Sequence, residues 1–134
     1  MLDFTFGERS EKSLQGVHPD LIKIARRTLQ ISPIDFMVIE GVRDSVRQEK
    51  LVNEGASTTT HSRHIPNTQG YACAIDIMCL DPAKHGTWEN KLYLELSKYF
   101  KQAADQLSVP MEWGGDWKSF HDYGHYQLPW AAYP

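Results

Sequence analysis

The chain carries, just past its middle, the apolar stretch GYACAIDIM at residues 70–78. Its small and β-branched residues predict a strand, and the polar Ser, Thr, Asn and Pro residues of 57–69 mark the loop before it. A second stretch, DFMVIE at residues 35–40, ends at Gly41 and predicts another strand. The first strand is unusual because it places a carboxylate, that of Asp76, among residues expected in the core.

Helical periodicity flanks these two strands. Apolar side chains recur at helical spacing between residues 21 and 29, with Pro19 near the expected first turn. A broad apolar stripe over residues 88–107 predicts a helix of about five turns, and residues 45–54 predict a shorter one. Residues 6–14 are polar and predict a loop with a short helical turn.

The C-terminal part predicts two more strands. Residues 111–113 and 125–128 flank the loop 114–124, which is the pattern of a hairpin-like pair. Helices come first, and strands and loops follow. The sequence therefore predicts the α+β fold class, in a single domain that spans residues 1–134.

Composition narrows the classes of function. The 134 residues include 41% hydrophobic and 23% charged side chains, as in an ordinary globular domain. With a net charge of -3 and no Lys/Arg run, we expect no nucleic-acid partner. No apolar run is long enough for a membrane span, and the N-terminus does not resemble a signal peptide. Cys73 and Cys79 are expected to be buried thiols.

Of the six histidines, His18 and His85 are expected at the surface without a role. His64 lies in the polar loop before the strand that carries Asp76. An imidazole and a buried carboxylate together are ligands that Zn²⁺ accepts, and a catalytic zinc site uses three protein ligands with one position left open. The alternative is that Asp76 pairs with an arginine or caps a turn.

A second cluster lies near the C-terminus, where Asp122 precedes His125 by three residues. His125 would be a third metal ligand, and Asp122 could then take a proton from a metal-activated water. Taken alone, the same pair also fits an ordinary His–Asp pair at the surface.

Seven short motifs follow one another along the chain, from about residue 6 to residue 128. In chain order they are Phe6-Gly7-Glu8-Arg9-Ser10, Leu14-Gln15-Gly16-Val17-His18-Pro19, Glu40-Gly41-Val42-Arg43, Ser62-Arg63-His64, Ala74-Ile75-Asp76, Trp113-Gly114-Gly115-Asp116-Trp117 and Asp122-Tyr123-Gly124-His125-Tyr126-Gln127. Together these motifs resemble one family of zinc peptidases, the D-Ala-D-Ala carboxypeptidase and L-alanyl-D-glutamate endopeptidase group, especially small phage endolysins.

The resemblance implies a small antiparallel sheet with flanking helices, a fold shared with the Hedgehog signalling domain. It also implies Zn²⁺ on His64, Asp76 and His125. Asp122 would be the catalytic base, and Arg43 would polarise the scissile carbonyl. Substrate contacts are expected from Ser62, His121 and Gln127, and His61 could orient neighbouring groups or contact substrate.

Two features depart from the family pattern. Asp76 follows His64 by twelve residues, a longer separation than is usual, so the insert around residues 65–71 must bulge away while both ligands stay in place. Gly124 stands where a proline is common in the family.

The resemblance implies a peptidoglycan hydrolase that cuts the L-Ala–D-Glu bond of the cell-wall stem peptide. The alternatives are a D-Ala-D-Ala carboxypeptidase and, outside the enzymes, a zinc-stabilised module that binds cell wall or protein. We further expect a monomer, made in the host cytoplasm without a signal peptide, that reaches the cell wall after holin-dependent release.

Overall fold

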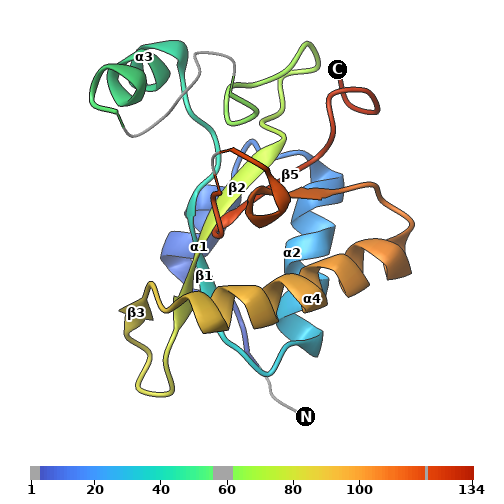
Figure 1. The fold of residues 1–134 in the computed structure, drawn as a ribbon. Coiled ribbons are helices and arrows are strands. Elements are labelled where there is room, and N and C mark those ends of the chain that lie inside the picture. The colour runs from blue at the N-terminus through green and yellow to red at the C-terminus, as the bar shows by residue number, and fades with distance from the viewer. Residues whose placement is uncertain (1–3, 56–61, 120) are drawn as a thin grey trace.

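The computed structural model describes residues 4–55, 62–119 and 121–134. Within this part, five strands form one antiparallel sheet, in which β1, β2, β5 and β4 follow one another and β3 also pairs with β2 (Figure 1). The strands are β1 (Phe36–Glu40), β2 (Ala74–Leu80), β3 (Gly86–Thr87), β4 (Glu112–Trp113) and β5 (His125–Gln127). The expected α+β fold with a small antiparallel sheet and flanking helices is confirmed.

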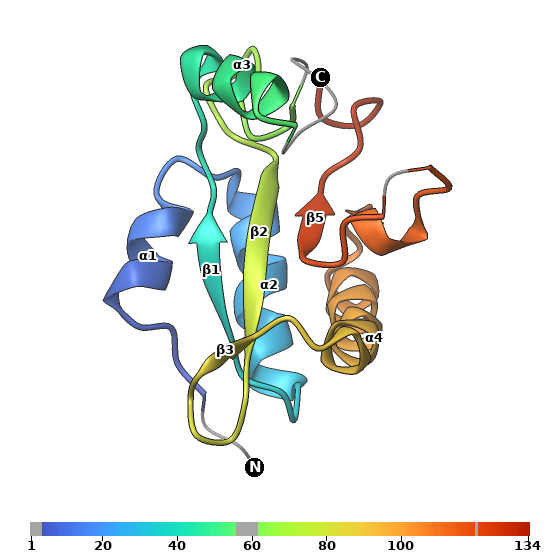
Figure 2. The same cartoon turned by 60° about the vertical axis from the view of Figure 1, so that its left-hand side comes forward.

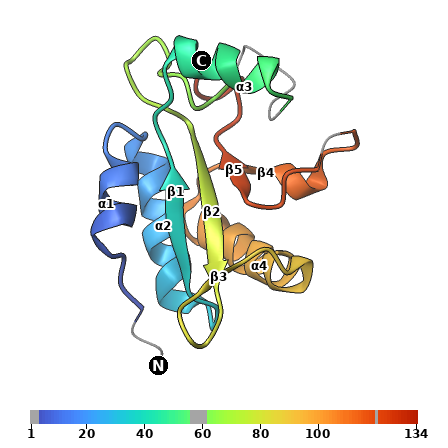
Figure 3. The ribbon, with the colours of Figure 1, turned by 90° about the vertical axis from the view of Figure 1, so that its left-hand side faces the viewer.

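Four helices surround the sheet in the described part of the chain: α1 (Glu8–Leu14), α2 (Pro19–Ile31), α3 (Ser45–Asn53) and α4 (Asn90–Leu107). The long helices α2 and α4 contact each other and cover one face of the sheet (Figure 2). Helix α1 lies beside β1, and α3 lies beyond one end of the sheet (Figure 3). The other face of the sheet is therefore not covered by the two long helices.

The core lies between the sheet and the two long helices, and its composition follows from the apolar periodicity. Leu21, Ile24 and Ala25 of α2 and Leu96 and Phe100 of α4 are all fully buried. Along β2, buried residues alternate with half-buried ones from Ile75 onward, as a strand with one covered face requires. Most of the predicted apolar positions therefore point into one cluster, whereas Leu94 and Leu107 of α4 are exposed.

The N-terminal segment differs from the prediction of a loop with a short turn, because residues 8–14 form the helix α1. Ser10 and Leu14 lie one turn apart and are both buried, so the helix has an inward face despite its polar sequence. The Ser10 hydroxyl accepts a hydrogen bond from the Val38 backbone N–H at 3.0 Å. A polar side chain thus fixes α1 to β1, which apolar periodicity does not reveal.

The two histidines expected at the surface behave differently. His85 is exposed, as expected. His18 is only partly exposed, because its ring packs edge-on against Tyr71 and Tyr133. Its Nδ1 accepts a hydrogen bond from the Asp20 backbone N–H at 3.0 Å and so caps α2. His18 therefore has a structural role as the cap of α2, which the sequence did not indicate.

Cys73 and Cys79 are free, buried thiols, as expected. Burial raises the pKa of the Cys73 thiol, and it raises the pKa of Cys79 to about 12. Neither thiol is therefore a thiolate near neutral pH.

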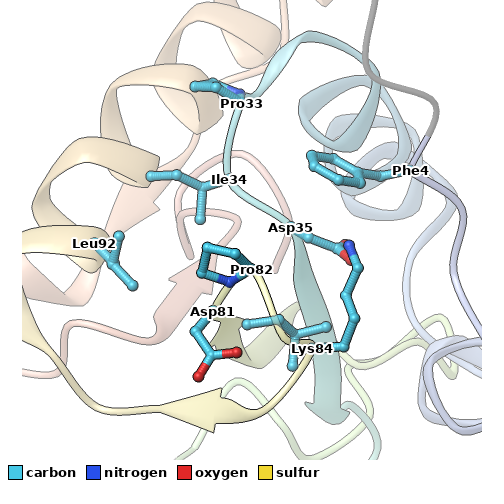
Figure 4. A pocket seen from close by; sticks show the side chains of 9 residues that line it. Phe4, Pro33, Ile34, Asp35, Asp81, Pro82, Lys84 and Leu92 are labelled. Carbon is cyan, nitrogen blue, oxygen red and sulfur yellow. The ribbon is translucent and has the colours of Figure 1, made fainter.

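An apolar pocket of about 330 Å³ lies at the end of β2 that carries Leu80, and Asp76 is not among its lining residues. Figure 4 shows this pocket from close by. Ile34, Pro82 and Leu92 line it, and the Lys84 ammonium lies at its edge. None of the described helices is both long and apolar enough to cross a lipid bilayer.

Two leucines on α4, one buried and one exposed, allow the contribution of core packing to stability to be measured. Leu96→Ala is expected to lower the free energy of unfolding by about 2–5 kcal/mol, because it empties a fully buried position between helix and sheet. Leu94→Ala, the matched control on the same helix, removes a side chain that is 48% exposed, and a change of about 0.5 kcal/mol or less is expected. Urea denaturation measures both, and equal losses would contradict this packing.

Candidate metal and catalytic site

Three side chains distant in the sequence meet at the centre of the sheet. Asp76 on β2 stands directly opposite His125 on β5, and His64 comes from the loop before β2. One potential ligand atom from each residue lies within 4.8 Å of the others. The structure thus brings the three predicted ligands together as a candidate metal site.

The Asp76 carboxylate joins the two histidines. Its Oδ1 lies 3.0 Å from His125 Nδ1, and its Oδ2 lies 3.2 Å from His64 Nε2. Burial would raise the pKa of Asp76, but the charges of His64 and His125 and the hydrogen bond with His125 outweigh burial and hold that pKa well below its ordinary value. Asp76 is therefore ionised at any pH at which the protein would work.

The outer ring nitrogen of each histidine is occupied. His64 Nδ1 lies 2.8 Å from the Gly41 carbonyl oxygen, and His125 Nε2 lies 2.7 Å from Gln127 Oε1. Both partners are acceptors, so each outer nitrogen must carry the proton. In the neutral rings, His64 Nε2 and His125 Nδ1 then present lone pairs to the Asp76 carboxylate.

This arrangement fits a cation. His64 Nε2 is buried and makes no hydrogen bond within the described part of the chain, although a carboxylate oxygen is nearby. Lone pairs and a carboxylate repel one another unless a proton or a metal ion lies between them. Burial lowers the pKa of His125, but the hydrogen bond and charge of Asp76 raise that pKa above its ordinary value, so this ring binds a proton more readily than a free imidazole does.

The insert between His64 and Asp76 forms a turn that closes on itself. Asn67 accepts the Gly70 N–H at its carbonyl, and its side-chain oxygen accepts the Gln69 and Tyr71 backbone N–H groups. At the base of the turn, the Cys73 N–H donates to the carbonyl of Arg63 at 2.8 Å. The extra residues therefore project away, and the ligands on either side keep their places.

The loop that carries His64 is also held from outside. The Arg43 backbone N–H donates to the His64 carbonyl at 2.8 Å. The guanidinium of the buried Arg63 stacks 3.9 Å from the centre of the Trp130 ring and donates to the Tyr133 carbonyl. The segment after β1 and the C-terminal segment thus both fix this loop.

Asp122 lies in the loop before β5, close to the three clustered residues. Burial is the largest effect on the pKa of Asp122 and raises it, and the negative charge of Asp76 raises it further. The charges of His125 and His64 partly offset both effects. A β-carbon on Gly114 would lie 3.0 Å from that of Asp122 and 3.1 Å from that of His125, so the Asp122–His125 segment packs directly on this glycine. A larger residue would push both side chains away.

Arg43 lies on the other side of Asp76. Its Nη2 donates to Glu40 Oε2 at 2.5 Å and to Asp76 Oδ2 at 3.4 Å. The side chain of Arg43 is 8% exposed, so its direction is fixed by these contacts. A guanidinium therefore stands beside the candidate metal site.

The three residues expected to contact substrate lie in different surroundings. The Ser62 hydroxyl accepts the His64 backbone N–H at 3.1 Å, and Gln127 contacts the His125 ring. His121 is exposed, and its Nδ1 lies 3.2 Å from the Gly115 carbonyl. His61 lies outside the described residues.

Sequence reasoning missed the parts played by Glu40 and Gly114. The signal for Glu40 was its position three residues before Arg43 at a strand end, where an acid and a base can pair. For Gly114, the consecutive glycines between tryptophans indicated a close approach, but not which segment approaches.

Comparisons with known proteins agree with this geometry. Residues 2–127 match the family described as phage L-alanyl-D-glutamate peptidase. The chain is 32% identical over 125 residues to the L-alanyl-D-glutamate peptidase of Escherichia phage T5, covering 91% of this chain and 88% of that protein. It is 28% identical over 106 residues to the peptidoglycan L-alanyl-D-glutamate endopeptidase CwlK of Bacillus subtilis, covering 71% of this chain and 61% of that one.

A solved structure is similar over nearly the whole chain. The L-Ala D-Glu endopeptidase ChiX of Serratia marcescens superimposes with a TM-score of 0.86 at 37% identity, covering 97% of this chain and 94% of that one. Sequence and structure therefore agree that this chain belongs to the family of phage L-alanyl-D-glutamate peptidases.

Proposed function

We propose that the chain is a zinc-dependent peptidoglycan endopeptidase that hydrolyses the L-Ala–D-Glu bond of the cell-wall stem peptide. The single observation that carries the proposal is the convergence of His64, Asp76 and His125, with two lone pairs and a carboxylate facing one point. Family membership and the named activities of the relatives support the choice of substrate. We take residues 1–134 to act as one catalytic domain.

Zinc is the metal that this donor set suits best. Two imidazole nitrogens and one carboxylate oxygen form a three-ligand set that leaves a fourth position open, as catalytic zinc sites do. When bound, zinc would act as a Lewis acid that polarises the scissile carbonyl and lowers the pKa of a water to about 7.

Asp122 is proposed as the general base and acid. Its carboxylate accepts a proton from the attacking water as the water oxygen bonds to the peptide carbon. The same proton then passes to the leaving amine as the C–N bond breaks, so the carboxylate is restored after each turnover. The raised pKa of Asp122 suits both steps, because it makes the carboxylate a better proton acceptor.

Arg43 is proposed to stabilise the oxyanion that forms at the peptide carbonyl. A guanidinium can donate two hydrogen bonds at fixed spacing to such an oxygen. Glu40 holds Arg43 in place beforehand, so less of its conformational freedom is lost in the reaction.

Family membership also supports a proposal for the partner and the place of action. We propose that the chain acts as a monomer on peptidoglycan, and that holin-dependent release brings it from the host cytoplasm to the cell wall. The phage origin of relatives supports this route. Bacterial relatives share the family as well.

Asp122→Asn is expected to reduce turnover of purified peptidoglycan by about 10²–10⁴-fold, because the amide cannot accept the proton of the attacking water. Zinc content should stay at about one ion per chain, since Asp122 is not one of the three clustered residues. Asp105→Asn, an exposed acid near the end of α4, is the matched control. Full activity of the Asp122 variant would exclude this role.

Mass spectrometry of fragments released from purified peptidoglycan is expected to reveal new amino termini at D-Glu, as cleavage after L-Ala requires. Release of free D-Ala without such termini would instead identify a D-Ala-D-Ala carboxypeptidase. Binding to peptidoglycan without any released fragment, in zinc-loaded protein, would identify a binding module.

The metal-free chain is expected to lose thermal stability as the pH rises above 6.5. Because the pKa of His125 is raised above 6.5, the stability it contributes is complete below that pH and is lost as the pH rises through the raised pKa. Asp76 does not add to this loss of stability at alkaline pH. Its pKa is lowered in the folded chain, so the stability that its ionised form contributes is lost only as the pH falls below 3.8. Thermal unfolding in the presence of a chelator measures the slope.

Two comparisons isolate the site from other titrating groups. Asp76→Asn should remove most of the loss of stability with rising pH, because it removes the carboxylate beside His125. The histidines elsewhere are the same in the variant and in the unmodified chain, so they contribute equally to both measurements. Zinc should replace the proton and restore stability at the alkaline end. An unchanged slope in the Asp76 variant would contradict the coupling of His125 to Asp76.

A further inference from the structure

The two histidines of the site are held at their outer nitrogens in different ways. His64 uses a backbone carbonyl, that of Gly41, whereas His125 uses a side chain, that of Gln127. Gln127 lies two residues after His125 on β5, so the two side chains point to the same face of the strand. Only the second contact can be removed by substitution without changing the backbone.

The contact between Gln127 and His125 is short and buried. Gln127 Oε1 lies 2.7 Å from His125 Nε2, and Gln127 is 8% exposed. The opposite ring nitrogen, Nδ1, lies 3.0 Å from Asp76 Oδ1. The amide therefore lies behind the ring, on the side opposite the metal cluster.

A neutral imidazole carries its proton on either nitrogen, and only the other nitrogen has a lone pair for a metal. If the proton were on Nδ1, the ring would donate to Asp76, and no lone pair would face the site. An acceptor behind Nε2 favours the proton there, and outer partners of this kind orient metal-binding histidines in general.

We propose that Gln127 is a positioning residue that fixes His125 in its Nε2–H tautomer and so leaves Nδ1 free for the metal. This inference rests on the proposed function, and it gives Gln127 a role at His125 in place of the expected contact with substrate. An amide suits the task better than a carboxylate would, because the site already holds the acids Asp76 and Asp122.

The first test uses metal-free protein and does not involve activity. Nitrogen-15 NMR of the His125 ring, at a pH where the ring is neutral, is expected to show the proton on Nε2 in the unmodified chain. Gln127→Met keeps the length of the side chain but removes the acceptor, and the proton should then shift partly or wholly to Nδ1. Gln102→Met, at an exposed position on α4, is the matched control.

The second test measures zinc affinity by competition with a chelator. Gln127→Met is expected to weaken zinc binding by about 10–100-fold. Gln127→Glu restores an acceptor oxygen, so it should keep the Nε2–H tautomer and bind zinc more tightly than the Met variant. If the Met variant does not fold, Gln127→Asn replaces it, because the shorter side chain keeps the amide but cannot reach Nε2.

The outcomes separate this inference from the proposed function. An unchanged tautomer together with unchanged zinc affinity in the Met or Asn variant would overturn the role of Gln127 and leave the peptidase proposal intact. Failure of the unmodified chain to bind zinc would overturn the proposed metal, while the NMR measurement would still decide whether Gln127 sets the tautomer. A shift of the proton to Nδ1 that Gln127→Glu reverses would support the proposal.

Discussion

The site depends on a single carboxylate placed between two imidazoles. Asp76 interacts with His125 through one oxygen and with His64 through the other, and Arg43 lies beside the second oxygen. A carboxylate in this position is costly unless positive charge surrounds it. The pairing of β2 with β5 places Asp76 opposite His125, and the pairing of β1 with β2 brings Glu40 opposite Asp76, so the sheet register itself assembles the charges.

The segments around the sheet keep the side chains around Asp76 in place. Gly114 allows the Asp122–His125 segment to approach closely, and the Trp113 indole N–H donates to the Tyr123 carbonyl at 2.9 Å within the same segment. On the opposite side, Arg63 ties the loop of His64 to the C-terminal residues. These contacts restrict the backbone near each functional side chain, which is how a small domain can keep polar groups aligned in its interior.

Much of the fold could be predicted from local patterns. The helix beginning at Pro19 and the strand ending at Glu40 follow from apolar periodicity and from the residues that end each element. Helix α1 could not, because its inward face includes Ser10, whose burial depends on a hydrogen bond to a strand distant in the sequence. Periodicity reports which side chains are apolar, and not which polar ones find partners.

The sequence predicted which residues form the site, but not which hydrogen bonds join them. Motif order identified the residues that meet, since His64, Asp76 and His125 lie in short recognisable segments. The hydrogen bond from His125 to Gln127 could not be foreseen, because which neighbour lies behind a ring depends on strand geometry and burial. For the pair of Glu40 and Arg43 the sequence offered only their spacing, which does not by itself show that the two side chains meet.

The self-closed turn around Asn67 also bears on how relatives of this chain are found. Because the turn satisfies its own hydrogen bonds and is closed at its base by Cys73 and Arg63, residues can be gained or lost there without moving the groups on either side. The number of residues between His64 and Asp76 can therefore change at this turn while the two side chains stay together. A search pattern with a fixed gap at this point would overlook members with intact chemistry, whereas one anchored on the flanking segments would retain them.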